Sequence, residues 1–116
     1  MDVYQGWFNL REGAFDLEVA EAFEAYMQDL QRRGLIAGWR LLRRKLGLGP
    51  AALGEFHFLV EANDLAQLEA AFRAVSTRSG NIESLHHALN SKVKDTVFAL
   101  YRDFPDPHRR TGEERF

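Results

Sequence analysis

A short run of alternating residues, EFHFLVE at positions 55–61, constrains this sequence more than any other feature. Its large apolar residues, Phe56, Phe58 and Val60, fall at every second position, so a β-strand would place them on one face. Each of these side chains gains roughly 1.5–3 kcal/mol on full burial. This face should therefore pack against other elements, whereas the opposite face, which carries His57, is partly polar.

Residues 37–46 are predicted to pair with this run as a β-hairpin, through a loop at residues 47–54 that is rich in glycine. The basic residues of the first segment fall on both faces, which a buried central strand does not tolerate. An edge strand does, because its charged side chains meet water and discourage pairing with other chains. These basic residues are Arg40, Arg43, Arg44 and Lys45.

The rest of the chain alternates between the periods of strands and helices. Residues 2–10 and 96–101 alternate as strands do. Residues 16–33, 64–80 and 82–93 repeat their apolar side chains at steps of three and four, as amphipathic helices do. The order is therefore β-α-β-β-α-α-β, the split-βαβ or ferredoxin-like arrangement. It predicts an α+β fold with a four-stranded antiparallel sheet, in which the first and third strands are central and helices cover one face.

Capping residues mark the predicted helix ends. Asp16 is expected to cap the first helix and Gly34 to stop it. Asp64 opens the second helix in a capping box, in which Gln67 reaches back to the backbone. Asn81 is expected to cap the third helix.

The ferredoxin-like domain is predicted to span residues 1–104. Residues 105–116 contain two prolines and several charges and lack any periodicity, so they are predicted to form an extended C-terminal arm. Phe116, at the end of this arm, is a candidate anchor.

The face of the sheet turned away from the helices is predicted to be too apolar to lie in water. Its apolar residues are expected to be Val3, Trp7, Leu59, Val97 and Tyr101. The predicted elements leave nothing to cover this face, so a second copy of the chain is expected to do so. The result would be a two-fold homodimer whose facing sheets enclose a cavity, a dimeric α/β barrel.

Composition excludes several classes of function. A formal net charge of −2 over 116 residues disfavours a nucleic-acid-binding protein. The absence of cysteine excludes disulfides, thiolate nucleophiles and cysteine-ligated metals. No apolar stretch approaches the ~20 residues of a membrane span, and the N-terminus lacks the pattern of a signal peptide. We therefore predict a cytoplasmic protein with no cofactor and with no nucleic-acid or membrane partner.

Five sequence blocks resemble a small, uncharacterised bacterial family of this architecture: MDVYQGW, RRKLGLGP, GEFHF, FALYRDFPD and GEERF. More distantly, the chain is similar to the dimeric α/β-barrel proteins, which include antibiotic-biosynthesis monooxygenases, EthD-like proteins and stress-responsive barrel proteins. The family resemblance implies a ferredoxin-like homodimer and carries no assigned reaction. The wider resemblance implies cofactor-independent oxygenation, haem degradation or lactone isomerisation, but no catalytic motif matches residue by residue.

A first candidate site lies on the helix-free face of the predicted sheet. Its residues are Gln5, Trp7, Asn9, His57 and Tyr101. A histidine beside two amides and a phenol can orient a polar ligand, or act as a general base near neutral pH. The same residues suit a dimer interface in which they satisfy one another by hydrogen bonds.

The basic residues of the edge strand form a second candidate site. Arg43 or Arg44 at the mouth of the cavity would hold a carboxylate or phosphate. With Leu46 opposite Glu55 in the hairpin, Arg44 lies beside His57. A shift of the register by one residue places Arg43 or Lys45 beside His57 instead. The alternative is that these are solvated edge charges that pair with nearby glutamates or with the acidic tail.

A third motif, Glu83-x-x-His86 followed by His87, has a spacing that occurs in carboxylate-bridged metal sites. Those sites repeat the motif on several helices, and this chain has one copy. His86 and His87 also point about a quarter-turn or more apart, so they do not chelate one ion together. We therefore interpret both as ordinary surface or capping histidines.

The sequence thus predicts a homodimer that binds a small, partly apolar molecule in a cavity on the helix-free face of its sheet. One alternative is a cofactor-independent monooxygenase or isomerase that uses the same cavity, with His57 as the base. The other is a structural or regulatory dimer with no ligand.

Overall fold

The structure, a computed structural model, describes residues 1–78 and 80–105. Within these residues the elements are β1 (Asp2–Leu10), α1 (Asp16–Arg32), β2 (Gly38–Arg43), β3 (Phe56–Ala62), α2 (Leu65–Ser76), α3 (Gly80–Asn90) and β4 (Val93–Arg102). The strands form one antiparallel sheet in the order β2-β3-β1-β4. The ferredoxin-like prediction is confirmed, including the central positions of β1 and β3.

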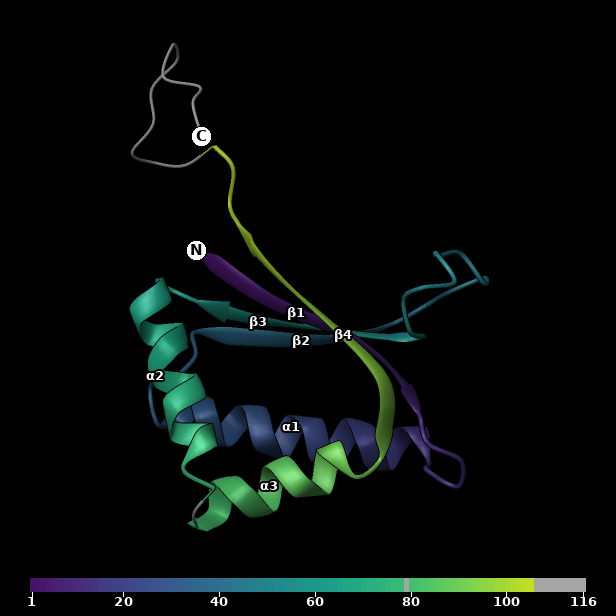
Figure 1. The fold of residues 1–116 in the computed structure, drawn as a ribbon, viewed down its shortest axis with the longest axis horizontal. Helices are drawn as coiled ribbons and strands as arrows, with labels where there is room; N and C mark the ends of the chain where they lie inside the picture. The colour runs from purple at the N-terminus through teal and green to yellow at the C-terminus, as the bar shows by residue number, and fades with distance from the viewer. Residues whose placement is uncertain (79, 106–116) are drawn as a thin grey trace.

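All the helices of the described residues lie on one side of the sheet (Figure 1). The alternation of each strand decides which side chains meet them. In the β1–β3 pair, Gly6 lies opposite Phe58 on the face toward the helices, and Trp7 lies opposite His57 on the other face. β4 continues both faces, with Val97 opposite Trp7. The predicted assignment of side chains to the two faces of β1, β3 and β4 is therefore confirmed.

The hydrophobic core lies between the sheet and the helices. Phe23 of α1 is 1% exposed, and its ring contacts Trp39 of β2 and Phe58 of β3 at centroid distances of 5.6 Å. Phe58 also covers Gly6, where an added Cβ would collide with its ring. The glycine thus allows the two central strands to share one aromatic layer.

The hairpin register differs from each of the three predicted ones. Leu42 lies opposite His57 and Arg43 opposite Phe56, and pairing ends where the Arg44 N–H donates to the Glu55 carbonyl at 2.8 Å. The chain leaves the strand earlier than predicted because the Arg44 guanidinium forms hydrogen bonds with the loop. Its Nη2 donates to the carbonyls of Pro50, Leu53 and Gly54.

The predicted helix ends are confirmed in part. Asp64 accepts from the Gln67 N–H at 2.8 Å, and Gln67 reaches back to the Asn63 N–H at 2.7 Å, so this capping box is confirmed. The N-cap of α1 is Phe15 rather than Asp16, because the Asp16 carboxylate binds its neighbour Leu17 and the hairpin instead.

At the remaining helix ends, Gly34 follows α1 with a φ of 73°, as a helix stop does. α2 ends at Ser76, short of the predicted end, and Asn81 lies inside α3 rather than before it. The predicted C-terminal arm, with Phe116, lies outside the described residues beyond Pro105.

Candidate functional site

Three of the predicted site residues meet on the helix-free face. The rings of Trp7 and His57 stack at a centroid distance of 4.3 Å, with 9° between their planes. His57 Nε2 lies 2.8 Å from Gln5 Oε1, so Nε2 carries the proton and donates it. Burial lowers the pKa of His57, which favours the neutral ring. One hydrogen bond and one ring stack thus join these residues within one subunit.

This lowered pKa predicts a pH-dependent stability. The unfolded chain takes up a proton near pH 6.5, before the folded chain does, so stability is full above that pH and falls as the pH drops through the lowered pKa of His57. The variant His57→Phe keeps an aromatic ring and should show a smaller loss of unfolding free energy between pH 7.5 and pH 5. Urea unfolding across this range measures the loss. His87→Phe, at an exposed position, is the control, and equal slopes for both variants would contradict the prediction.

Two other predicted residues lie apart from this cluster. Asn9 ties β1 to its neighbours, because its Oδ1 accepts from the Glu55 N–H at 2.9 Å and its Nδ2 donates to Asp95 at 3.3 Å. Tyr101 lies on the edge strand β4, opposite Val3, and is 62% exposed.

The predicted cations are held within the subunit. Arg43 lies on the helix-covered face because of the observed register, so the interpretation that places it on the helix-free face is wrong. Its guanidinium donates to Asp16 at 2.9 Å and to Glu55 at 2.8 Å, and these two carboxylates raise the pKa of Arg43. Arg44 braces the hairpin loop, as described above.

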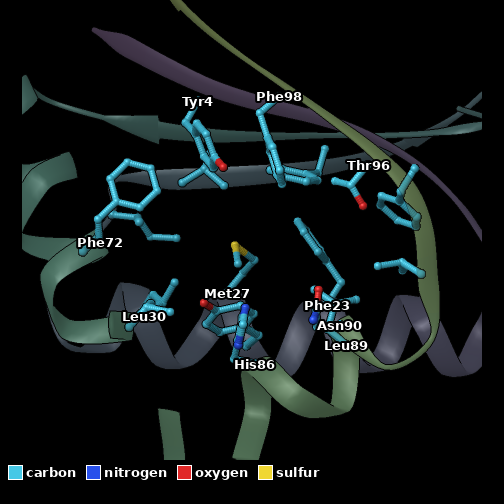
Figure 2. A pocket seen from close by; sticks show the side chains of 18 of the residues that line it. Tyr4, Phe23, Met27, Leu30, Phe72, His86, Leu89, Asn90, Thr96 and Phe98 are labelled. Carbon is cyan, nitrogen blue, oxygen red and sulfur yellow. The ribbon is translucent and has the colours of Figure 1, made fainter. Parts of the chain in front are cut away.

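A cavity of about 250 Å³ lies on the other side of the sheet, between the strands and the helices. Figure 2 shows Tyr4 and Phe98 on its sheet side and His86 and Asn90 of α3 on the opposite side. Its lining residues are mostly apolar and aromatic: Tyr4, Phe8, Phe23, Tyr26, Met27, Leu30, Ile36, Phe58, Val60, Leu68, Ala71, Phe72, Val75, His86, Leu89, Asn90, Val93, Thr96 and Phe98. None of the predicted site residues is among them.

His86 is the residue whose place the sequence interpretation missed. It was interpreted as a surface or capping histidine, but it lines the cavity and contacts the Tyr26 ring edge-on, at a centroid distance of 5.8 Å. A signal for this was present, because His86 shares one helix face with Ile82 and Leu89. His87, by contrast, is exposed as predicted.

The cavity opens along the edge strand β4. Its exposed lining residues come from β4, α2 and α3, so the opening lies between that strand and those two helices: Phe72, Asn90, Thr96 and Phe98. At this opening Tyr4 stacks on Phe98 at 5.6 Å and meets Phe72 edge-on at 5.0 Å.

Polar groups reach the cavity without partners in the described part of the chain. The hydroxyls of Tyr4 and Tyr26 and the ring nitrogens of His86 form no hydrogen bond with residues 1–78 or 80–105. Burial, the nearby Tyr4 and the charge of Glu83 raise the pKa of Tyr26 to about 12, and burial raises the pKa of Tyr4. Both phenols therefore stay protonated at neutral pH and are available as donors.

Glu83 lies one helical turn before His86. Its Oε2 is shielded from water and has no hydrogen-bond partner among the residues that the structure describes. Burying a carboxylate costs free energy unless a hydrogen-bond donor reaches it. It makes the potential more negative at the wall where α1 and α3 meet.

The described residues offer no metal site, since no three histidine or acidic side chains among them come together. None of α1, α2 and α3, the helices of the described residues, has the length and apolar character that crossing a lipid bilayer requires.

Solved structures of other proteins share this fold. SnoaB, a cofactor-independent oxygenase from Streptomyces nogalater, aligns with a TM-score of 0.69 at 11% identity, over 93% of this chain and 97% of that chain. At3g17210 from Arabidopsis thaliana aligns with a TM-score of 0.71 at 6% identity, over 91% and 98%. A dimeric ferredoxin-like protein of unknown function from Jannaschia sp. CCS1 aligns with a TM-score of 0.65 at 11% identity, over 88% and 98%.

In sequence, residues 1–116 match the profile of a family of unknown function, DUF6614. No curated protein matches the chain.

Proposed function

Because the chain belongs to DUF6614, a family of unknown function, we propose its function from its geometry: it binds a small aromatic molecule in the cavity between its sheet and its helices, as a homodimer. The cavity itself is the observation that carries this proposal. A cavity of about 150 Å³ holds one benzene, so 250 Å³ has room for a molecule of about two rings. Aromatic walls favour such a ligand through stacked and edge-on contacts.

The homodimer is supported by the helix-free face. Figure 1 shows no described element on this side of the sheet, and its edge residues Val97 and Tyr101 are 41% and 62% exposed. A second copy related by a two-fold axis would cover this face with the same face of its own sheet. The Jannaschia protein of similar fold is described as dimeric. In this arrangement Gln5, Trp7 and His57 belong to the interface, and the ligand lies on the opposite side of each sheet.

Substitutions on two neighbouring residues of α2 test the ligand site. Ala71 is buried and lines the cavity, whereas Ala70 is exposed. We expect Ala71→Phe to fill the cavity and to weaken the binding of naphthalene, measured by isothermal titration calorimetry, by at least about tenfold. Ala70→Phe should bind as the original chain does. Failure of the original chain to bind naphthalene, or equal binding by both variants, would contradict the proposal.

The homodimer is tested by light scattering. The chain has a mass of 13.3 kDa, and we expect a particle of twice that mass. Val97→Glu puts a charge into the proposed interface and should shift the particle to the mass of one chain, because a charge buried there without a partner is costly. Leu17→Glu, at a residue of α1 that is 74% exposed, should leave the mass unchanged. A single-chain mass for the original protein would refute the dimer.

A second candidate function is a cofactor-independent oxygenase that acts on the molecule in the same cavity. The observation that favours it is the shared fold with SnoaB, which is described as such an oxygenase. Oxygen uptake by the purified protein in the presence of a bound two-ring phenol would support this candidate. Binding without uptake would favour a binding protein.

A further inference from the structure

We propose that the ligand of the cavity is a neutral aromatic molecule of about two rings that carries a hydroxyl group, and that His86 and Tyr26 bind this hydroxyl. This inference rests on the proposed function, since it names the class of molecule that the cavity takes. It assigns a binding role to the wall where α1 and α3 meet.

The wall where α1 and α3 meet carries two polar side chains. His86 and Tyr26 contact each other edge-on at 5.8 Å and both line the cavity. Neither side chain has a hydrogen-bond partner among residues 1–78 and 80–105. A neutral imidazole offers one donor and one acceptor, and a phenol offers a donor and acceptor lone pairs. A hydroxyl also donates and accepts, so one such group can satisfy both side chains.

The charges around the cavity exclude an anionic ligand. Among the described residues, the lining set contains no lysine, arginine, aspartate or glutamate. A carboxylate ligand would therefore find no lysine or arginine to pair with. It would also lie near Glu83, whose buried Oε2 has no partner in the same part of the chain. Desolvation and like-charge repulsion then act against it together.

A cationic ligand is disfavoured for a different reason. Glu83 is not among the lining residues, so an ammonium group in the cavity would be attracted by its charge but would form no direct ion pair or hydrogen bond with it. The ammonium group would lose its hydration on entering the cavity. Contacts with aromatic faces and phenols would offset only part of that cost in free energy. A neutral hydroxyl avoids this loss and still meets the donors and acceptors of the wall.

The remaining walls place the rings of the ligand. Tyr4, Phe58 and Phe98 contact one another on the sheet side, with Phe98 at the opening. A two-ring molecule whose hydroxyl meets His86 has its rings directed toward these aromatic side chains. The hydroxyl thus lies at the wall where α1 and α3 meet, and the far ring lies toward the sheet and Phe98.

The test compares four probes by isothermal titration calorimetry: naphthalene, 2-naphthol, 2-naphthoate and 2-naphthylmethylammonium. We expect 2-naphthol to bind roughly tenfold more tightly than naphthalene, and the two ions to bind more weakly than naphthalene. Equal affinities for naphthol and naphthalene, or tightest binding of either ion, would overturn the inference and leave the cavity function standing. Binding of none of the four would overturn both.

Matched variants locate the hydroxyl. His86→Phe keeps a ring at this position and removes its nitrogens, so the affinity for 2-naphthol should fall to about that for naphthalene, while naphthalene binding is unchanged. Tyr26→Phe should act in the same direction and checks the result if His86→Phe does not fold. His87→Phe, on the exposed side of the same helix, should change neither affinity. An unchanged preference for 2-naphthol in both His86→Phe and Tyr26→Phe would overturn the assignment.

Discussion

Replacing Phe23 by alanine is expected to lower the free energy of unfolding by about 3–5 kcal/mol, the range found for large buried aromatic side chains. Phe23 is 1% exposed and lies where α1 crosses the sheet, in contact with Trp39 and Phe58. Both neighbours belong to strands that are hydrogen-bonded in the sheet, so they cannot move in to fill the space. The loss therefore combines the transfer of the ring to water with a cavity that stays open.

Urea unfolding followed by circular dichroism, at one protein concentration for all variants, measures this loss. The matched control is Leu17→Ala on the same helix. Leu17 is 74% exposed, so its truncation should change the free energy of unfolding by less than about 0.5 kcal/mol. A loss below about 1.5 kcal/mol for Phe23→Ala would show that α1 does not pack on the sheet as described.

Adding one methyl group at Gly54 is expected to destabilise the protein by about 3 kcal/mol. Gly54 is buried just before β3, and a Cβ there would collide with the backbone N, C and O atoms of Phe8 in β1. Backbone atoms of a central strand cannot move aside without breaking its hydrogen bonds to both neighbours. The effect therefore lies at the upper end of the range for overpacking a well-packed interior.

Gly38→Ala is the control for Gly54→Ala, because a Cβ at Gly38 meets nothing closer than the Glu61 side chain, at an ordinary contact distance of 3.8 Å. This substitution should therefore cost less than about 1 kcal/mol. Thermal unfolding measures the melting temperatures of both variants, and that of Gly54→Ala should be clearly lower. Similar melting temperatures would mean that β1 and the start of β3 do not approach each other this closely.

The strand faces were predictable because the side-chain period of a strand is local. Phe56 and Phe58 face the helices, and His57 faces away, whatever the strand pairs with. The same applies to Tyr4 and Trp7 of β1. The central position of β3 also followed, since its apolar face needs cover whereas the cations of β2 need water.

The site was less predictable. Gln5, Trp7 and His57 do come together as the alternation indicates. The cavity, however, lies on the face that was assigned to core packing. The periodicity of the helices shows which way Tyr26 and His86 point. It does not show whether side chains fill the space between these helices and the sheet.

By itself, the sequence determined the order of the elements, the two faces of each strand and the capping of α2 by Asp64, because each depends on residues near one another in the chain. Only the tertiary structure decided the hairpin register and the position of the cavity. The register depends on which loop carbonyls the Arg44 guanidinium reaches. The cavity depends on how far the edge strand β4 stands from α2 and α3, a distance set by the packing of whole elements rather than by any local pattern.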